Sequence, residues 1–368
     1  MANSGAPKDI ARKIKPSVFV FRIGQLGDSL VALPAIQKIK ELNHGFNIVL
    51  ITDQADNENY VNSWAVFELT KVFSEKIPYK KTLMSIIKLI WRLRREPKAK
   101  LYYLMPDRPA ILRQRDKIFF EKICGIKYIV GFDSVVDKES IKDKYGSLTW
   151  QQPEFEQLLR LVLPSSPMSK LEILPRPYLY PAEKDFNKVK KIMKLGSQKC
   201  LTIALGPGSK MLGKKWPVER YSEFVSYTLN TFSNCRVVIF GAPNEQNDSD
   251  YICDNNRSKR LISLVGSTNI IESAAALSLC TFYVGNDSGT MHLAAAMGLP
   301  CIGIFSSRAN PGRWEPFGSQ NIILRKDSNH VGCELVSCHL CLKGLKKISL
   351  EEVIDATTIM KKSLGFEN

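Results

Sequence analysis

The sequence of 368 residues lacks any run of 18 apolar residues, the minimum for a membrane-spanning helix. Its first residues, MANSGAPKDIARKIKP, hold no apolar core, so we expect no secretory signal there. Repeats and low-complexity segments are absent. Neither the P-loop pattern nor G-x-G-x-x-G after a strand is present, which gives an ATPase or nicotinamide site little support.

Acidic residues are few beside the basic ones, with 36 Asp and Glu against 52 Lys and Arg and a formal charge of +16. This excess predicts an anionic partner: a membrane surface, nucleic acid or a phosphorylated substrate. The length predicts two domains, and 44% apolar residues suffice for their cores. Four of the nine cysteines lie in or beside apolar strands, which indicates reduced thiols and a cytoplasmic location. These four are Cys200, Cys235, Cys280 and Cys301.

The stretch from Thr281 to Phe305 predicts a strand, a tight turn, a helix and a second strand. In its turn, Asp287 or Ser288 can cap the following helix. A strand that enters a helix through a glycine-bearing turn leaves unpaired N–H groups at the positive end of the helix dipole, which suits an anion. His292, in the first helical turn, could also reach a phosphate. An ordinary strand–helix connection explains the same pattern, and the residues alone favour neither interpretation.

The first half begins with a similar alternation. We predict strands at Ser17–Ile23 and Asn47–Thr52, with a helix at Ser29–Leu42 that Pro34 should kink. This order predicts a doubly wound sheet. Asp28 is either a helix N-cap or a carboxylate at the end of the first strand, where it could act as a general base. The residues alone favour the cap.

The region 76–127 concentrates the positive charge of the first half, with 15 Lys and Arg against 4 Asp and Glu. Within it, Thr82–Arg95 has the apolar spacing of a helix. Its apolar stripe consists of Leu83, Ile86, Ile87, Ile90 and Trp91. The first interpretation is a core helix with a solvated basic end, and the second is a surface that meets anionic lipid through Trp91. Nucleic acid is less favoured, because no recognition motif is present.

The remaining pattern predicts four segments: a Rossmann-like domain (1–175), a Pro-rich linker (176–181), a second Rossmann-like domain (182–345) and a C-terminal helix (346–368), which we expect to pack towards the first domain. Further elements are expected at Lys100–Pro106, Tyr128–Phe132, Gln157–Leu163, Lys170–Leu174, Lys184–Leu195, Cys200–Leu205, Val218–Phe232, Arg236–Phe240, Leu261–Val265, Ile270–Leu279 and Ser349–Leu364. The fold class is α/β, with two doubly wound domains facing a central cleft.

Two loops of the second half carry phosphate-binding chemistry. Gly206–Lys210 offers flexible backbone, the Ser209 hydroxyl and the Lys210 ammonium. Lys214 and Lys215 add point charges that suit a diphosphate. Lys-rich loops are usually only solvated, but together with the 281–305 turn they indicate a nucleotide diphosphate.

A second cluster contains Cys333, Cys338 and Cys341, with His330 and His339 nearby. One C-x2-C pair with scattered ligands could hold zinc. A structural zinc site normally uses two paired sets, and the second is missing, so we expect no metal.

Four motifs together resemble glycosyltransferase family 9, the ADP-heptose:lipopolysaccharide heptosyltransferase family. They are Arg22-x4-Gly27-Asp28-x5-Pro34, Lys214-x-Trp216-Pro217, Gly241-Ala242-Pro243 and Asp287-Ser288-Gly289-x2-His292-x-Ala294-Ala295-Ala296. The resemblance implies the GT-B fold, with the acceptor on the first domain and the nucleotide sugar on the second. It also implies that Asp28 is the general base on the acceptor hydroxyl, with Arg22 and Gly27 on the acceptor side.

The same resemblance implies a donor site. Lys214 is expected to contact the donor phosphates, Asp287 to face the donor sugar and Glu245 to approach the ribose or base. The other expected phosphate-side residues are Ser209, Lys210, Lys215, Ser288, Gly289 and His292, although Lys210 stands where the family often has a hydroxyl residue.

The resemblance implies a transfer that inverts the anomeric carbon and needs no essential metal. The first expectation is the transfer of heptose from ADP-heptose to a glycan or lipopolysaccharide-type acceptor. The nucleotide sugar is then a substrate, and no cofactor is expected. The enzyme is expected in the cytoplasm, with peripheral contact to the inner membrane through region 76–127 and no nucleic-acid partner. The alternatives are a GT-B-fold nucleotide-sugar epimerase and a non-catalytic basic protein that docks on membrane or nucleic acid.

Overall fold

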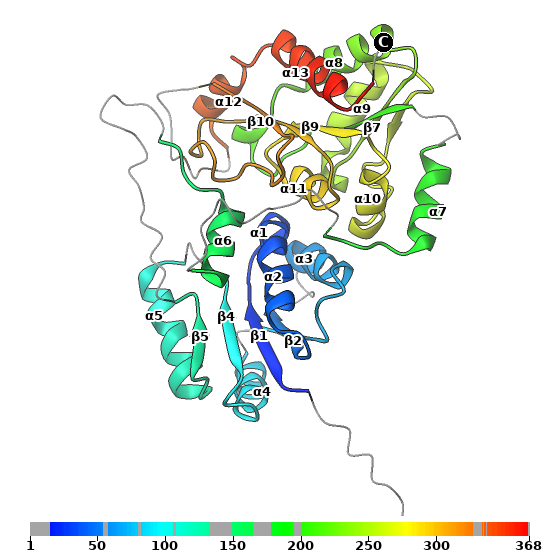
Figure 1. Cartoon of the computed structure of the whole chain (residues 1–368). Coiled ribbons are helices and arrows are strands. Elements are labelled where there is room, and N and C mark those ends of the chain that lie inside the picture. Colours follow the sequence, from blue (N-terminus) through cyan, green and yellow to red (C-terminus); the bar gives the residue numbers. More distant parts are fainter. Residues whose placement is uncertain are drawn as a thin grey trace, which may run out of the picture.

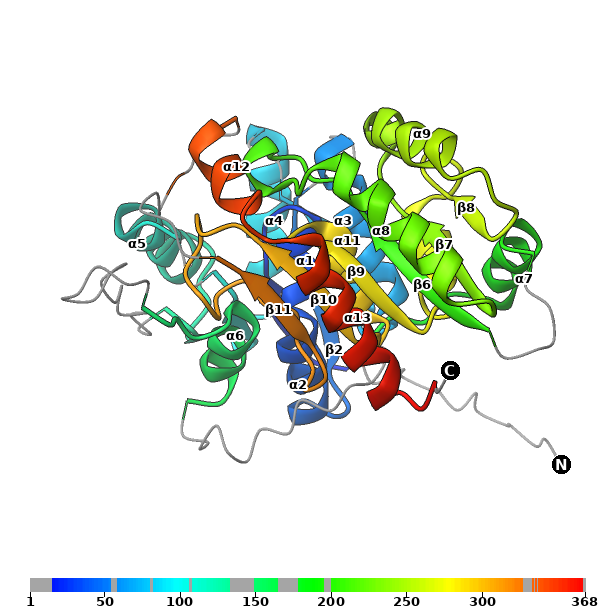
Figure 2. The same ribbon diagram turned by 90° about the horizontal axis from the view of Figure 1, so that it is seen from above.

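The protein was analysed as a computed structural model, which shows two parallel β-sheets with helices around them (Figures 1 and 2). The structure describes residues 15–53, 58–79, 82–105, 108–132, 149–164, 178–194, 200–326, 333, 335 and 337–366. The strand expected at Lys170–Leu174 and the start of the expected linker lie outside these residues.

The first sheet has the order β3-β2-β1-β4-β5, with every neighbouring pair parallel. Its strands are β1 (Ser17–Phe21), β2 (Asn47–Thr52), β3 (Glu75–Pro78), β4 (Lys100–Tyr103) and β5 (Tyr128–Val130). Its helices are α1 (Leu26–Val31), α2 (Leu33–Leu42), α3 (Glu58–Leu69), α4 (Leu83–Arg94), α5 (Ala110–Ile118), the π-helix η1 (Phe119–Ile123) and α6 (Glu154–Val162). The chain builds outwards from β1 to β3 and then returns to β4, so the topological switch point lies between β1 and β4.

The second sheet has the order β11-β10-β9-β6-β7-β8 and is also parallel. Its strands are β6 (Leu201–Gly206), β7 (Cys235–Ile239), β8 (Leu261–Ser263), β9 (Phe282–Asn286), β10 (Cys301–Phe305) and β11 (Ile322–Arg325). The helices are α7 (Glu183–Ile192), η3 (Leu212–Lys214), α8 (Val218–Thr231), η4 (Pro243–Glu245), α9 (Gln246–Asn255), α10 (Ile270–Leu277), α11 (Gly289–Ala296), α12 (His339–Leu345) and α13 (Leu350–Ser363). Here the switch point lies between β6 and β9. In sheets of this kind ligands bind outside the carboxyl ends of the strands at such a point.

The helix expected at Ser29–Leu42 is two helices, α1 and α2, which meet at Ala32. Pro34 is the second residue of α2, where a missing N–H costs no hydrogen bond, so the expected kink is a full break. The start of α1 at Leu26 corrects the boundary, because the capping position belongs to Gln25 and not to Asp28.

Two packing expectations are wrong. Helix α13 was expected to pack towards the first domain, but it packs against α8, β10 and β11 of the second sheet (Figure 2). The reason is its apolar face, since Val353, Ala356 and Met360 belong to the core of that sheet. Helix α4 buries Leu89 and Leu93, whereas most of the stripe expected in the core faces solvent.

The apolar stripe on the outside of α4 consists of Leu83, Met84, Ile87 and Trp91, which are 50–75% exposed. The Arg95 guanidinium lies 3.3 Å from the centroid of the Trp91 ring. The buried residues Leu89 and Leu93 form a different row of the helix, spaced i, i+4. Because both rows are apolar, the spacing alone could not decide which of them is buried. Within the described residues, no helix combines the length and apolarity needed to cross a bilayer.

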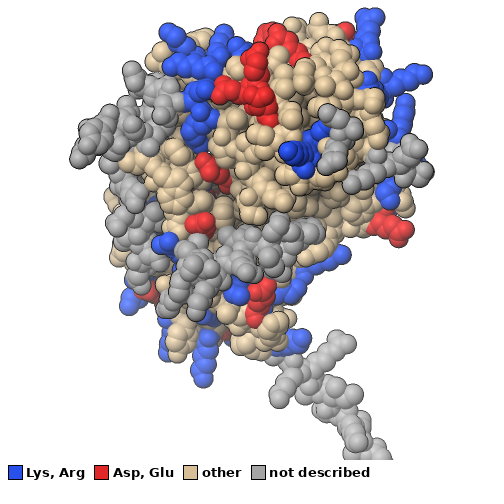
Figure 3. Space-filling view, turned by 45° about the horizontal axis from the view of Figure 1, so that its top comes forward, with Lys and Arg blue, Asp and Glu red and all other residues tan. Residues whose placement is uncertain are grey.

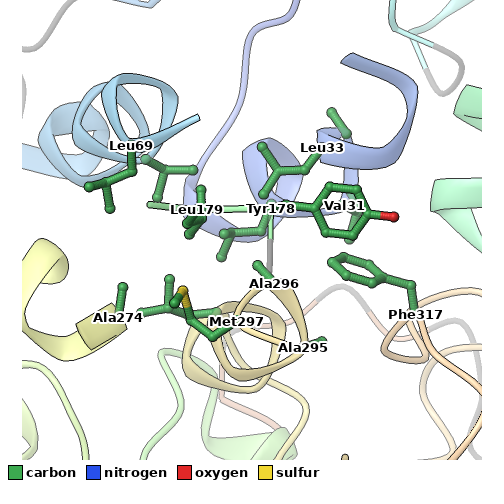
Figure 4. Close-up of a cluster of buried hydrophobic side chains, with 14 of the residues drawn as sticks. Val31, Leu33, Leu69, Tyr178, Leu179, Ala274, Ala295, Ala296, Met297 and Phe317 are labelled. Atoms are coloured by element: carbon green, nitrogen blue, oxygen red, sulfur yellow. The ribbon is translucent and has the colours of Figure 1, made fainter. Parts of the chain in front are cut away.

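The two sheets share one hydrophobic cluster, which joins α1, α2 and α3 to α10 and α11 (Figure 4). Tyr178 and Leu179, which follow the Pro-rich segment, are buried inside it. The Tyr178 amide donates to the Ala296 carbonyl of α11 at 2.8 Å, and the Tyr180 amide donates to the Leu69 carbonyl of α3 at 2.9 Å. The connecting segment is therefore hydrogen-bonded to both halves of the molecule.

Candidate active site

Asp28 lies at the start of α1, just past the carboxyl end of β1 and next to the switch point of the first sheet. Its Oδ2 accepts a hydrogen bond from the Gln25 amide at 2.9 Å, and this contact closes a capping box. The side chain keeps 35% of its surface exposed. A carboxylate has about four lone-pair sites, so this single backbone contact leaves room for a substrate hydroxyl. The capping and base interpretations are compatible in this geometry.

Arg22 is buried beneath the Asp28 loop and holds it in place. Its Nε and one terminal nitrogen donate to the Asp28 carbonyl at 3.0 and 2.7 Å, and the other donates to the Leu104 carbonyl at 2.8 Å. The hydrogen bonds of Arg22 thus hold the Asp28 loop, and one of its terminal nitrogens lies 3.8 Å from both Asp28 Oδ1 and Glu154 Oε1. Its expected place on the acceptor side remains a prediction.

Gly24 makes the close turn before Asp28 possible. Its φ of +156° is unfavourable for other residues, and a Cβ there would lie 2.5 Å from the Asp28 Cβ. The short helix can therefore bend back over its own capping loop only with glycine at this position.

Asp287 follows β9 at the switch point of the second sheet and is paired with Lys214. The Lys214 Nζ lies 2.5 Å from Asp287 Oδ2, and the two side chains are 19% and 6% exposed. The pair brings the Lys-x-Trp-Pro motif to the Asp-Ser-Gly turn. Such an ammonium is well placed to exchange its carboxylate partner for a phosphate when one enters.

The residue that joins these loops is Asn286, which is fully buried at the end of β9. Its Oδ1 accepts from the Trp216 amide at 3.0 Å and from the Tyr221 hydroxyl at 2.8 Å. Its Nδ2 donates to the Pro207 carbonyl at 2.6 Å. Sequence analysis missed this role, because Asn286 resembled an ordinary turn residue; its position directly before Asp287 was the one available signal.

His292 lies in the first turn of α11, within electrostatic reach of both Asp287 and Asp28. Its Nε2 is 4.0 Å from Asp287 Oδ1, and the negative charge of Asp28 also acts to raise its pKa. Burial lowers the pKa of His292 to about 4, against the opposing effect of Asp287. Its buried Nδ1 has no hydrogen-bond partner within the described part of the chain. His292 is thus a neutral imidazole at pH 7, and its Nδ1 atom is available for a hydrogen bond with a ligand.

The starts of α1 and α11 touch, which joins the two switch points. A Cβ on Gly289 would lie 3.0 Å from the Leu26 side chain, and one on Gly27 would lie 3.6 Å from the His292 ring. Asp28 is therefore one residue from the His292 contact. Ser288 caps α11 from an extended conformation and leaves the first N–H groups of the helix at this junction.

The Gly206–Lys210 loop lies against Glu245. A Cβ on Gly208 would fall 2.1 Å from the Glu245 carboxyl carbon, so only glycine fits there. Burial raises the pKa of Glu245, whose carboxylate accepts from the Ala242 amide at 2.8 Å.

The other lysines of this region lie apart from Asp287. Lys215 pairs with Asp248 of α9, a partner the sequence did not indicate, so the two neighbouring lysines have different carboxylate partners. Lys210 is exposed at the end of its loop, and the Ser209 hydroxyl accepts from the Met211 amide. Lys214, Asp287, Ser288, Gly289 and His292 come together, whereas Lys215 and Glu245 form a neighbouring group around the glycine loop.

Residues 176–341 match glycosyltransferase family 9 (heptosyltransferase). Over this stretch, which is less than half of the chain, the protein is similar to glycosyltransferase family 9. It is 26% identical to lipopolysaccharide heptosyltransferase 2 of Salmonella typhimurium over 178 residues, which are 46% of this chain and 50% of that protein. The chain spans about half the length of the curated relatives it matches.

Solved structures confirm the GT-B fold of this chain. The Escherichia coli ADP-heptose lipopolysaccharide heptosyltransferase II has a TM-score of 0.65 and 18% identity, covering 94% of this chain and 99% of that one. A family 9 glycosyl transferase from Veillonella parvula has a TM-score of 0.71 and 17% identity, covering 95% and 98%. The UDP-GlcNAc 2-epimerase of Neisseria meningitidis is more distant, at a TM-score of 0.50 and 13% identity.

Proposed function

We propose that this chain is an inverting glycosyltransferase that moves heptose from ADP-heptose to a glycan or lipopolysaccharide-type acceptor. The observation that carries the proposal is the meeting of the two switch points, where Asp28 of the first half lies beside the Lys214–Asp287–His292 group of the second. The names of the relatives support the donor and the acceptor class.

In the proposed reaction, Asp28 accepts the proton of the acceptor hydroxyl as its oxygen attacks the anomeric carbon of the sugar. The nucleoside diphosphate leaves on the opposite side. Lys214 and the first N–H groups of α11 stabilise the charge that develops on the leaving diphosphate. Asp287 would repel phosphate, so its carboxylate suits the sugar hydroxyls.

The test of the base is Asp28→Asn. The amide oxygen of asparagine can still accept from the Gln25 amide, so the capping contact and the fold should remain. We expect turnover to fall by about 10²–10⁴-fold, because a general base typically contributes that much. The affinity for ADP, the nucleotide part of the proposed donor, is measured by calorimetry and should stay within about twofold of that of the unmodified chain. Unchanged turnover would remove Asp28 from the mechanism.

The donor base is tested by a thermal-shift panel of ADP, UDP, GDP, CMP and dTDP. A ligand at 100 times its dissociation constant stabilises by about 2.7 kcal/mol, which is a shift of several degrees. A shift with ADP alone supports the proposed donor. No shift with any nucleotide would favour the non-catalytic basic protein, and a shift with UDP accompanied by epimerisation would favour the epimerase.

A membrane-bound acceptor is favoured by the outer face of α4. Its exposed apolar stripe is flanked by Lys88, Arg94 and Arg95, which are also exposed, and this is the composition of an interfacial helix. On the face seen in Figure 3, Lys and Arg side chains lie in several separate groups with acidic residues between them. We therefore assign the proposed lipid contact to the local apolar and basic face of α4.

Vesicle sedimentation tests this face. The double variant Ile87→Ala/Trp91→Ala should bind anionic vesicles about tenfold more weakly than the unmodified chain, because about 1.4 kcal/mol of apolar contact corresponds to that factor. The matched control is Ile359→Ala/Tyr251→Ala, two exposed residues of α13 and α9. Equal loss in both double variants would contradict a specific role for α4.

A further inference from the structure

Three cysteines meet next to the donor loop. Cys333, Cys338 and Cys341 have their sulfur atoms within 4.8 Å of one another. Cys338 precedes α12 directly and Cys341 lies in its first turn, while Cys333 comes from the preceding segment. Cys341 is fully buried and Cys338 is 8% exposed. None of the nine cysteines forms a disulfide bond, so a disulfide does not explain the cluster.

The cluster has a spacing and size that suit a metal ion. The sequence C-x4-C-x2-C brings three thiols to one point, although a disulfide could join only two of them. Zinc–sulfur bonds of about 2.3 Å in a tetrahedron place the sulfur atoms about 3.8 Å apart, so the observed group needs only a small contraction. The earlier expectation of no metal rested on the missing second pair, but the fold supplies Cys333 as a third ligand.

A buried arginine lies beside the thiols. Arg308 donates to the Cys333 carbonyl at 2.5 Å and to the Leu335 carbonyl at 3.2 Å, and thus fixes the segment that carries the first cysteine. A divalent ion with three thiolates has a net charge of −1. The guanidinium of Arg308 offsets such a charge in this buried position.

The cluster also contacts the loop that carries Lys214. Helix α12 packs against η3, and a Cβ on Gly213 would lie 2.8 Å from the Cys341 Cβ and 3.1 Å from Arg308. Anything that orders the cysteines therefore also orders the residue directly before Lys214.

We propose that Cys333, Cys338 and Cys341 bind one thiophilic divalent cation, Zn²⁺ or Fe²⁺, and that this ion anchors η3. Soft thiolate ligands select these metals over Mg²⁺ or Ca²⁺. The three protein ligands leave a fourth position for water or another donor. The role is structural: the ion fixes the donor loop and takes no part in transfer.

The test begins with the metal content of the full-length chain, purified under reducing conditions with Zn²⁺ or Fe²⁺ in the growth medium. Inductively coupled plasma mass spectrometry should find metal in about equimolar amount. Reconstitution with Co²⁺ should produce thiolate-to-metal charge-transfer absorption. Metal content and cobalt absorption are measured without transfer activity, so they do not depend on the proposed function.

The variants are Cys333→Ser and Cys341→Ser, with Cys253→Ser of α9 as the matched control. Both cluster variants should lose the metal and the cobalt absorption, whereas the control should keep them. Cys333 is only half-buried, so its variant should fold even where Cys341→Ser does not, and circular dichroism checks this. A chelator should lower the melting temperature of the unmodified chain and of the control, but not of Cys333→Ser.

Three results would overturn the proposal. One is an unmodified chain without metal after incubation with either cation. Another is a disulfide between two of the three cysteines found by mass spectrometry of the freshly isolated protein. The third is equal cobalt binding by the cluster variants and the control.

Discussion

The neutral state of His292 has a consequence for stability against acid. Burial lowers its pKa to about 4, whereas an unfolded histidine titrates near 6.5. Between these values the unfolded chain binds more protons than the folded one, so stability falls as the pH falls. The full difference is on the order of 3 kcal/mol, since each pKa unit corresponds to about 1.4 kcal/mol. The stability is intact above about pH 6.5 and is lost progressively towards pH 4.

The comparison is between the unmodified chain and His292→Gln, each unfolded by urea at several pH values from 7.5 to 4.5. Carboxylates titrate in both proteins, so the difference between the two pH profiles isolates the imidazole. We expect the free energy of unfolding of the unmodified chain to fall more steeply with falling pH than that of His292→Gln. The difference between the two proteins should be about 1 kcal/mol smaller at pH 5.5 than at pH 7.5. Nuclear magnetic resonance of labelled histidine should find the His292 ring neutral at that pH. Parallel profiles, or a ring that titrates near 6.5, would refute the reasoning.

Two further predictions concern the donor loops. Lys214→Met should weaken ADP binding in calorimetry by about 10–100-fold and lower the free energy of unfolding by about 1–3 kcal/mol, because Asp287 loses its partner. The double variant Lys214→Met/Asp287→Asn should recover the stability but not the affinity for ADP, and Lys190→Met on the exposed face of α7 is the control. Recovery of the affinity in the double variant would assign the binding effect to Asp287. Gly208→Ala should lower the free energy of unfolding by about 1–3 kcal/mol, because its Cβ crowds the Glu245 carboxyl group, and the loss should be smaller in a Glu245→Ala background. Equal losses in the urea unfolding of both backgrounds would show that crowding is not the cause.

The sequence predicted the strands well and the loops less well. Asn47–Thr52 and Cys301–Phe305 were predicted to the residue, because buried parallel strands are short apolar runs between turn signals. Weak apolar patterns concealed α3, β3, α5, α9 and β11. The two faces of α4 show why periodicity was insufficient: both rows are apolar, and only the packing decides which one is buried.

The candidate site was predictable where it follows strand ends. Asp28 and Asp287 stand just past buried strands, so their neighbourhood follows from parallel topology. The position of Arg22 beneath its loop, the linking role of Asn286 and the pairing of Lys215 with Asp248 depend on contacts between residues distant in the sequence. The convergence of Cys333 with its two neighbours is of the same kind.

The cluster shared by the two sheets affects how the protein is made. The first half leaves the ribosome before α10 and α11 exist, yet Val31 and Leu33 lie in the same cluster as Ala296 and Met297. Until those helices are synthesised, the nascent chain carries an apolar face with nothing to cover it, and such faces promote aggregation. The halves are therefore poor candidates for separate expression. A fragment that ends before β6 should be insoluble alone and should become soluble when the second half is produced with it.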